Sequence, residues 1–193
     1  MRTHKVAGVV LGAVVAGLLA GCSGTADTAP QSPQRATAAG QQRHNDADVT
    51  FLQDLLPHHV QTGTMTDLAR TKAASPKVKA LATRIKAEQD QQITRIHDLL
   101  GAWGVPITAG DSGNGQVPGI LSDQQMQQLS SASGSEFDQT FLRLMIDHQQ
   151  GAIQLAQTEL AQGSDPQARR IAQDTVTRQQ TQVNQMQKML QAT

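Results

Sequence analysis

An internal repeat is the feature that most constrains how this chain can fold. Residues 48–100 align with residues 138–190 at a constant offset of 90 and without a gap. Conservative apolar pairs lie between the identical ones. The identical pairs include Asp48/Asp138, Thr50/Thr140, Phe51/Phe141, Leu52/Leu142, His58/His148, Pro76/Pro166, Ala82/Ala172, Gln89/Gln179, Gln92/Gln182 and Leu100/Leu190. A register that holds over this length predicts two copies of one structural unit.

The pattern inside each copy predicts a helical hairpin. Apolar residues recur at spacings of three and four along residues 51–69 and 141–155, which is typical of a helix with one buried face. Ser75-Pro76 and Asp165-Pro166 then offer an N-cap and a proline at the first helical position. We therefore expect second helices over 76–100 and 166–191.

Three other local signals refine this pattern. Pro57 lies inside the first helix, where it removes a backbone donor and should kink it. Gly101 and Gly104 are expected to end the second helix. Ser122 and Gln125 resemble a capping box, which predicts a short extra helix to about residue 129.

Four amphipathic helices in two hairpins bury their apolar faces best against each other. The sequence thus predicts an all-α fold, a four-helix bundle built from two repeated helical hairpins with approximate two-fold symmetry, over residues 48–193. Composition agrees, because the chain has three Phe, one Trp and no Tyr. A sheet would favour aromatic and β-branched residues.

The beginning of the chain has the pattern of an export signal. Arg2 and Lys5 precede an apolar stretch over residues 6–20. This stretch is shorter than the ~20 residues that span a bilayer and is typical of a signal peptide. Leu19-Ala20-Gly21-Cys22 resembles the bacterial lipobox, which implies cleavage before Cys22 and a lipid on its sulfur. We expect residues 1–21 to be a lipoprotein signal peptide and the protein to be anchored to the cell membrane, facing the extracytoplasmic side.

Residues 22–47 are rich in Ser, Thr, Ala, Gln, Gly and Pro, which predicts a flexible tether. Cys22 is the only cysteine, so a disulfide within the chain is excluded. Sixteen Lys and Arg balance sixteen Asp and Glu, and no basic patch indicates a nucleic-acid partner. The sequence indicates no particular protein partner.

Polar residues interrupt the apolar faces at equivalent positions of the two copies. His58 and His148 are repeat partners and should face one another near the bundle axis. Four glutamines lie on the second helices within plausible reach of them. These are Gln89, Gln92, Gln179 and Gln182. One interpretation is a buried network of imidazoles and amides that fixes helix register.

The other interpretation is a metal site. Met145 lies three residues before His148, so both project from one helix face. Met65 lies two turns from His58, and His59 points about 100° away round the helix. Imidazole and thioether ligands suit copper, particularly Cu(I), and not magnesium or calcium.

Enzymatic chemistry is not expected. The chain has three glutamates and no Glu-x-x-His sequence, so a di-iron centre of the ferritin kind lacks its ligands. The sequence contains no Gly-x-Ser-x-Gly elbow, phosphate loop or paired catalytic carboxylates. The single cysteine is assigned to lipid.

The two first helices, FLQDLLPHHVQTGTMTDLA and FDQTFLRLMIDHQQGAIQLAQTEL, resemble the signature helices of the domain-of-unknown-function 305 family. The resemblance covers residues 48–191. It implies a ferritin-like fold and, as in some members, periplasmic copper binding and copper tolerance. By position the family motif carries over to His58, His59, Met65, Met145 and His148. Gln149 and Leu155 stand where the second family motif has histidine and methionine.

The resulting prediction is a non-catalytic, membrane-anchored lipoprotein that binds a soft metal such as copper in metal homeostasis of the cell envelope. The alternative is a structural or protein-interaction module with a buried His–Gln network and no metal.

Overall fold

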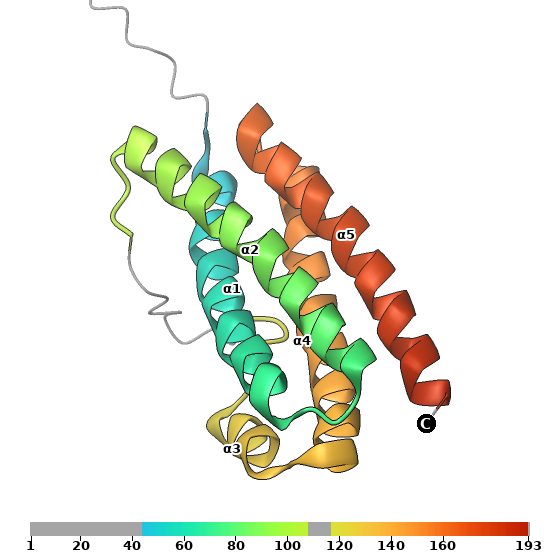
Figure 1. Cartoon of the computed structure of the whole chain (residues 1–193). Helices are drawn as coiled ribbons and strands as arrows, with labels where there is room; N and C mark the ends of the chain where they lie inside the picture. Colours follow the sequence, from blue (N-terminus) through green and yellow to red (C-terminus); the bar gives the residue numbers. More distant parts are fainter. Residues whose placement is uncertain (1–43, 108–116, 193) are drawn as a thin grey trace, which may run out of the picture. The chain divides into compact units, whose positions relative to one another are not determined.

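The computed structural model describes residues 44–107 and 117–192, which form five helices and, within those ranges, no strand. The helices are α1 (Asp46–Lys72), α2 (Pro76–Trp103), α3 (Asp123–Ser131), α4 (Gly134–Gln162) and α5 (Pro166–Gln191). The predicted all-α bundle of two helical hairpins is confirmed (Figure 1). The predicted signal peptide over 1–21, Cys22 and most of the predicted tether lie outside the described residues.

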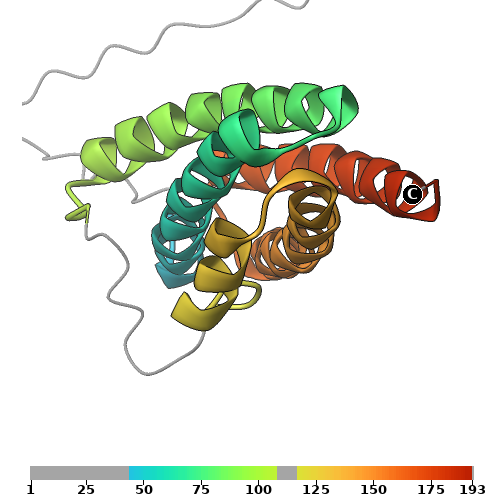
Figure 2. The same ribbon diagram turned by 60° about the horizontal axis from the view of Figure 1, so that its bottom comes forward.

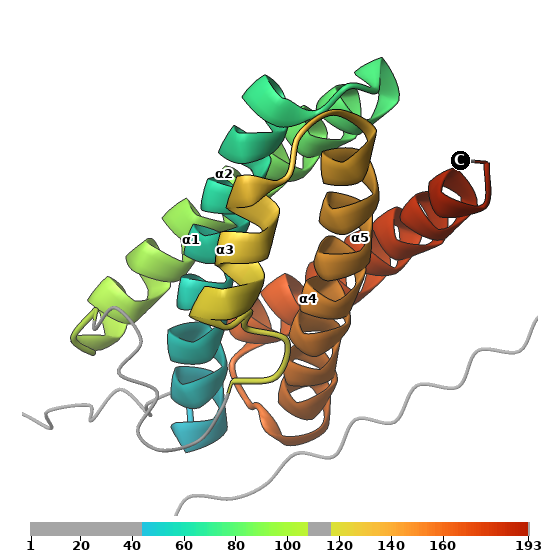
Figure 3. The ribbon, with the colours of Figure 1, turned by 90° about the horizontal axis from the view of Figure 1, so that it is seen from below.

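The two hairpins pack through their first helices. α1 packs against α2 and α4, and α4 packs against α5 (Figures 1 and 2). α2 and α5 approach each other closely at few backbone positions. The short helix α3 lies against α1 and α4, as Figure 3 shows. None of the described helices is both long and apolar enough to cross a membrane.

The first helix begins earlier than the repeat suggests. Asn45 is its N-cap and forms a capping box with Asp48. The Asp48 backbone N–H donates to Asn45 Oδ1 at 3.1 Å, and the Asn45 backbone N–H donates to Asp48 Oδ2 at 2.6 Å. α1 therefore starts at Asp46, and the prediction that the tether extends to residue 47 is wrong at its end.

The second helices begin at the predicted prolines, but their caps differ. Asp165 Oδ1 accepts from the backbone N–H groups of Gln167 and Ala168 at 2.7 and 3.0 Å. Ser75 makes no side-chain cap bond, contrary to the expectation from Ser75-Pro76. In both turns, a residue of the other hairpin binds the backbone.

This exchange between hairpins is reciprocal. Asp138 at the start of α4 accepts from the backbone N–H of Ser75 at 2.8 Å, in the α1–α2 turn. Asp48 at the start of α1 accepts from the backbone N–H of Asp165 at 2.9 Å, in the α4–α5 turn. The two contacts are equivalent to each other at the offset of 90, which pairs Asp48 with Asp138 and Ser75 with Asp165. They show the approximate two-fold symmetry that the repeat predicts.

Two local expectations about helix ends have different outcomes. α2 continues past Gly101 to Trp103, whose ring stacks on His44 with centroids 4.2 Å apart. The helix ends at Gly104, which has a φ of 68° and so takes the left-handed conformation that glycine favours. α3 begins with the predicted Ser122–Gln125 capping box.

The core consists of two apolar clusters with a polar layer between them. One cluster contains residues from the second half of α1 and the first half of α4, and the other contains residues from the first half of α1 and the second half of α4. All four long helices contribute buried polar residues between the clusters. These residues are His58, His59, Thr62, Gln89, Gln92, His148, Gln149, Thr175, Gln179 and Gln182.

Candidate metal site

The polar layer is centred on two facing histidines. His58 on α1 and His148 on α4 are each 1 % exposed. His58 Nδ1 lies 3.0 Å from His148 Nε2, and the ring centroids are 4.0 Å apart at an interplanar angle of 35°. This is the facing arrangement that the repeat predicts.

The outer nitrogen of each ring contacts a backbone carbonyl oxygen. His58 Nε2 lies 2.6 Å from Pro118 O, and His148 Nδ1 lies 2.9 Å from Gly119 O. A carbonyl oxygen only accepts hydrogen bonds, so each outer nitrogen must carry the hydrogen. The two inner nitrogens are then left as acceptors that face each other.

Counting hydrogens shows that the pair is incomplete. Four short contacts need a hydrogen or a cation between their atoms: the one to Pro118 O, the one to Gly119 O, the one between the rings, and the one of 3.1 Å between His148 Nε2 and His58 O. Two neutral imidazoles carry only two N–H groups. Whichever tautomers are chosen, at least one contact brings two lone pairs together. That contact therefore lacks the positive charge, a proton or a metal ion, that would join its two atoms.

Thr62 does not remove this deficit. Its hydroxyl lies 3.0 Å from His148 Nε2 and 3.1 Å from His58 O. A hydroxyl has one hydrogen and can give it to only one of these acceptors. It does not lie between the two ring nitrogens that face each other.

Burial keeps the two rings neutral. Desolvation lowers the pKa of His58 well below its usual range, and the neighbouring His148 lowers it further. Desolvation also lowers the pKa of His148, although hydrogen bonds to Gly119 and His58 oppose this. A neutral imidazole is the form that binds a metal ion.

The structure places His59 in a separate contact. His59 Nε2 lies 2.7 Å from Gln92 Oε1, and Gln92 Nε2 donates to Thr175 Oγ1 at 3.3 Å. Of the predicted glutamines, Gln92 thus contacts His59, whereas backbone carbonyls contact the outer nitrogens of His58 and His148. His59 therefore faces the seam between α1 and α2, away from the His58–His148 pair.

The second copy repeats this contact with a different side chain. Gln149, the repeat partner of His59, donates through Nε2 to Gln182 Oε1 at 2.6 Å. Gln182 Nε2 in turn donates to Glu88 Oε2 at 2.8 Å. Gln89 and Gln179 complete the layer, and their Oε1 atoms are buried.

The two candidate methionines lie in the larger apolar cluster. Met65 and Met145 are fully buried there, among side chains such as Phe137 and Leu142. In the described part of the chain, no three His, Cys, Asp or Glu side chains are grouped closely enough to hold a metal ion. A site at this pair would therefore use two imidazoles and could add softer or neutral groups, not a cluster of carboxylates.

Sequence reasoning missed the backbone segment that holds both rings. Pro118 and Gly119, which lie in the segment that links the two copies, provide the acceptors for His58 and His148. Side-chain patterns carry no signal for a carbonyl oxygen. The Gly and Pro content of this segment was the only available sign of a close backbone approach.

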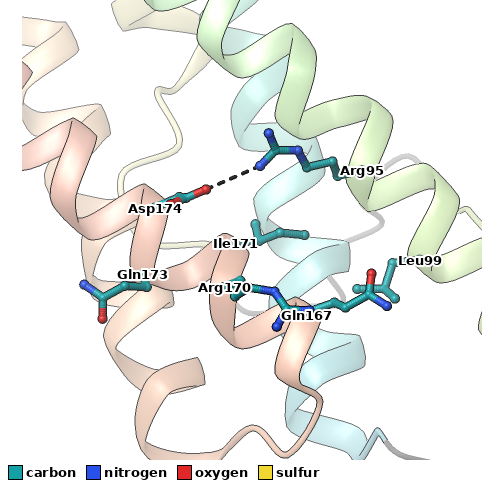
Figure 4. Close-up of a pocket in the computed structure, with 7 residues that line it drawn as sticks. All are labelled: Arg95, Leu99, Gln167, Arg170, Ile171, Gln173 and Asp174. Atoms are coloured by element: carbon teal, nitrogen blue, oxygen red, sulfur yellow. Dashed lines mark hydrogen bonds and ion pairs between the residues drawn. The ribbon is translucent and has the colours of Figure 1, made fainter.

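Two cavities lie away from the histidines, at the two ends of the seam between α2 and α5. One has a volume of about 330 Å³ and is bridged by an ion pair between Arg95 and Asp174 at 3.3 Å (Figure 4). The other, of about 590 Å³, lies near the equivalent bridge, in which Arg84 donates to Gln185. None of the predicted site residues lines either cavity.

The sequence and the fold are similar to those of known proteins. The sequence profile of the domain of unknown function DUF305 matches residues 48–190. A DUF305 protein from Streptomyces coelicolor, described as secreted, is 26% identical, with a TM-score of 0.71 over 76% of this chain and 93% of that one. A DUF305 fragment from Deinococcus radiodurans is 27% identical, with a TM-score of 0.71 over 77% and 98% of the two chains.

A third similar structure is that of a protein with a bound metal. CopM in its Cu(II)-bound form is 26% identical and has a TM-score of 0.66 over 75% of this chain and 96% of that one. CopM structures also exist in Cu(I)-bound and silver-bound forms. No curated protein sequence matches the chain significantly. Because the profile covers both hairpins, the chain belongs to the DUF305 family.

Proposed function

We propose that this protein is a non-catalytic, lipid-anchored metal-binding protein of the cell envelope, and that it holds one soft ion, copper foremost, between His58 and His148. The observation that carries the proposal is the missing hydrogen between His58 Nδ1 and His148 Nε2, which lie 3.0 Å apart. An ion bound by both nitrogens would remove the contact between two lone pairs. The ion would be cargo, and the protein would supply no reaction.

The arrangement of the rings supports this proposal. Metal-binding histidines commonly donate their other N–H to a carboxylate or a backbone carbonyl, which fixes the tautomer and makes the ligand more basic. His58 and His148 both do so, through Pro118 O and Gly119 O. The similarity to CopM, which has copper-bound and silver-bound forms, supports the same class of ion.

The donor set narrows the choice of ion. Two imidazoles without a carboxylate suit copper, whereas calcium and magnesium require oxygen ligands. The burial of both rings also disfavours ions that keep several waters. We expect Cu(I) and Ag(I) to bind more tightly than calcium or magnesium, and one ion to bind per chain.

The test is a titration of the purified protein with Cu(I), and separately with Ag(I), read by competition with a chelator and by thermal unfolding. The wild-type protein should gain stability with added ion, because a ligand that binds the folded state stabilises it by mass action. His58→Gln and His148→Gln should each abolish this gain.

His59→Gln is the matched control for these variants. The Gln149–Gln182 contact shows that glutamine can occupy the equivalent position, so the change should leave ion binding intact. An unchanged melting temperature of the wild-type protein with Cu(I) and Ag(I) would contradict the metal site. The buried polar layer would then have a purely structural role.

A further inference from the structure

The segment Val117–Leu121, which we call the strap, connects to α3 and lies over the histidine pair. Its carbonyl groups contact both hairpins at once, since Pro118 O accepts from His58 and Gly119 O from His148. The positions of the two rings therefore depend on where this one segment of backbone sits.

α1 holds the strap by two hydrogen bonds from one side chain. Gln61 Nε2 donates to Leu121 O at 2.9 Å, and the Leu121 N–H donates to Gln61 Oε1 at 2.8 Å. This pairing satisfies both backbone groups of Leu121. Gln61 lies three residues after His58, so one face of α1 presents both the ring and the group that holds the strap.

α4 holds the strap by close contact of two backbones. A Cβ atom at Gly151 would overlap the carbonyl oxygen of Pro118. Gly119 has a φ of +81°, and a Cβ atom there would lie 2.7 Å from His148 O and 2.8 Å from Gly151 Cα. Only glycine allows this approach at both positions. Gly151 lies three residues after His148, as Gln61 does after His58.

Gln61 and Gly151 are repeat partners at the offset of 90. The same position of the duplicated helix thus contacts the strap in two ways. In α1 the side-chain amide of Gln61 binds the strap, and in α4 the backbone at Gly151 packs against it. The repeat by itself would give two equal surfaces, whereas a single strap needs two different ones.

We propose that Gln61 and Gly151 are positioning residues that act on the histidine pair through the strap, and that a metal ion enters only when the strap moves. The inference about ion entry rests on the function proposed above. Metal–nitrogen bonds are about 2 Å long, so an ion held in line between the two facing nitrogens needs a gap wider than the present 3.0 Å. Widening that gap moves the rings relative to the strap carbonyls that fix them.

The first test reads the tautomers in the metal-free protein by ¹⁵N NMR of the imidazoles. The wild-type protein should carry hydrogen on His58 Nε2 and His148 Nδ1. Gly151→Ala, which displaces the strap, and Gln61→Leu, which releases it from α1, should each give a mixture of tautomers. Gly63→Ala is the matched control, because Gly63 is also a helical glycine but an added Cβ meets nothing within 4 Å. Wild-type tautomers in both strap variants would overturn the positioning role.

The second test measures association of Ag(I) by stopped flow. Gly151→Ala and Gln61→Leu should bind about tenfold faster than the wild-type protein and Gly63→Ala, because each change weakens the hold on the strap. Equal rates in all four proteins would overturn the role of the strap in entry. If the wild-type protein binds no ion, the proposed function fails, and the tautomers alone then decide whether Gln61 and Gly151 position the rings.

Discussion

The hairpin of α1 and α2 and the hairpin of α4 and α5 use the same contacts where they meet and different ones elsewhere. Asp48 and Asp138 each bind the turn of the opposite hairpin, and His58 faces its own repeat partner. Away from these contacts, glutamine replaces histidine at position 149. Duplication of one hairpin is therefore sufficient to bring two equivalent imidazoles together. The differences between the two copies determine which groups surround them.

The sharpest difference lies at the turn of the second hairpin. Glu159 is 1 % exposed, and no donor meets its carboxyl oxygens in ordinary hydrogen-bond geometry. Burial raises the pKa of Glu159 to about 8, with a further contribution from Asp48 and opposition from Arg169. For Asp48, burial opposes ionisation, but hydrogen bonds from Asn45 and other groups outweigh it and hold its pKa below the ordinary value.

The first copy contains nothing comparable. The repeat partner of Glu159 is Ala69, which is fully buried. Asp138 binds the first turn through the backbone N–H groups of Ala74 and Ser75. A buried carboxyl group therefore accompanies Asp48 at the second turn, whereas an alanine occupies the equivalent position in the first copy.

The largest expected effect tests whether His58 and His148 contribute equally to copper binding. His58→Leu and His148→Leu should both abolish stabilisation by copper. Each should also cost about 1 to 3 kcal/mol without metal, because a buried polar partner is left unsatisfied. Chemical denaturation with and without Cu(I) measures both quantities. A variant that loses stability but keeps the copper effect would show that the two rings are not joint ligands.

The next effect concerns the proton on Glu159. Its pKa is about 8 in the folded protein and near the ordinary 4.5 when unfolded. The folded state therefore retains a proton that the unfolded state releases, and stability falls as pH rises from about 4.5 to about 8. Glu159→Gln should remove this loss and be more stable than the wild-type protein by about 1 to 3 kcal/mol at pH 9.

The measurement is the difference in unfolding free energy between wild type and Glu159→Gln across pH 5 to 9. Taking this difference removes the contribution of the buried histidines, which is the same in both proteins. Because their pKa values are lowered in the folded state, these histidines make the protein less stable as the pH falls below the ordinary pKa of histidine. A difference that does not change with pH would show that Glu159 is ionised in the folded protein throughout.

A smaller effect tests the thioether. Met145→Leu makes α4 match α1, where the repeat partner is Leu55. The change conserves volume and should cost under about 1.5 kcal/mol. We expect weaker binding of Cu(I), measured by chelator competition, because Met145 lies one turn from His148. Unchanged affinity would limit the ligands to the two imidazoles.

The smallest expected effect comes from placing glutamine at position 59, as at the equivalent position 149. His59→Gln should change stability by no more than about 1 kcal/mol, since an amide hydrogen bond to Gln92 replaces the imidazole one. Thermal unfolding measures this change. A larger loss would show that His59 supports the core in a way that Gln149 does not.

The sequence by itself determined the helices, their pairing and the facing histidines. These features follow from periodic apolar spacing, from prolines at helix starts and from one constant offset, all of which are local or repeated along the chain. The repeat requires that equivalent residues meet near an approximate two-fold axis, so His58 and His148 were predictable as a pair.

The tertiary structure alone decided what holds that pair. The acceptors are carbonyl oxygens of Pro118 and Gly119, and every residue type carries such an oxygen. Similarly, Asp138 and Asp48 each bind the backbone of the turn in the opposite hairpin, and no pattern within one hairpin shows this contact. Contacts of this kind depend on how closely two backbones approach, and that distance is fixed only when the hairpins pack.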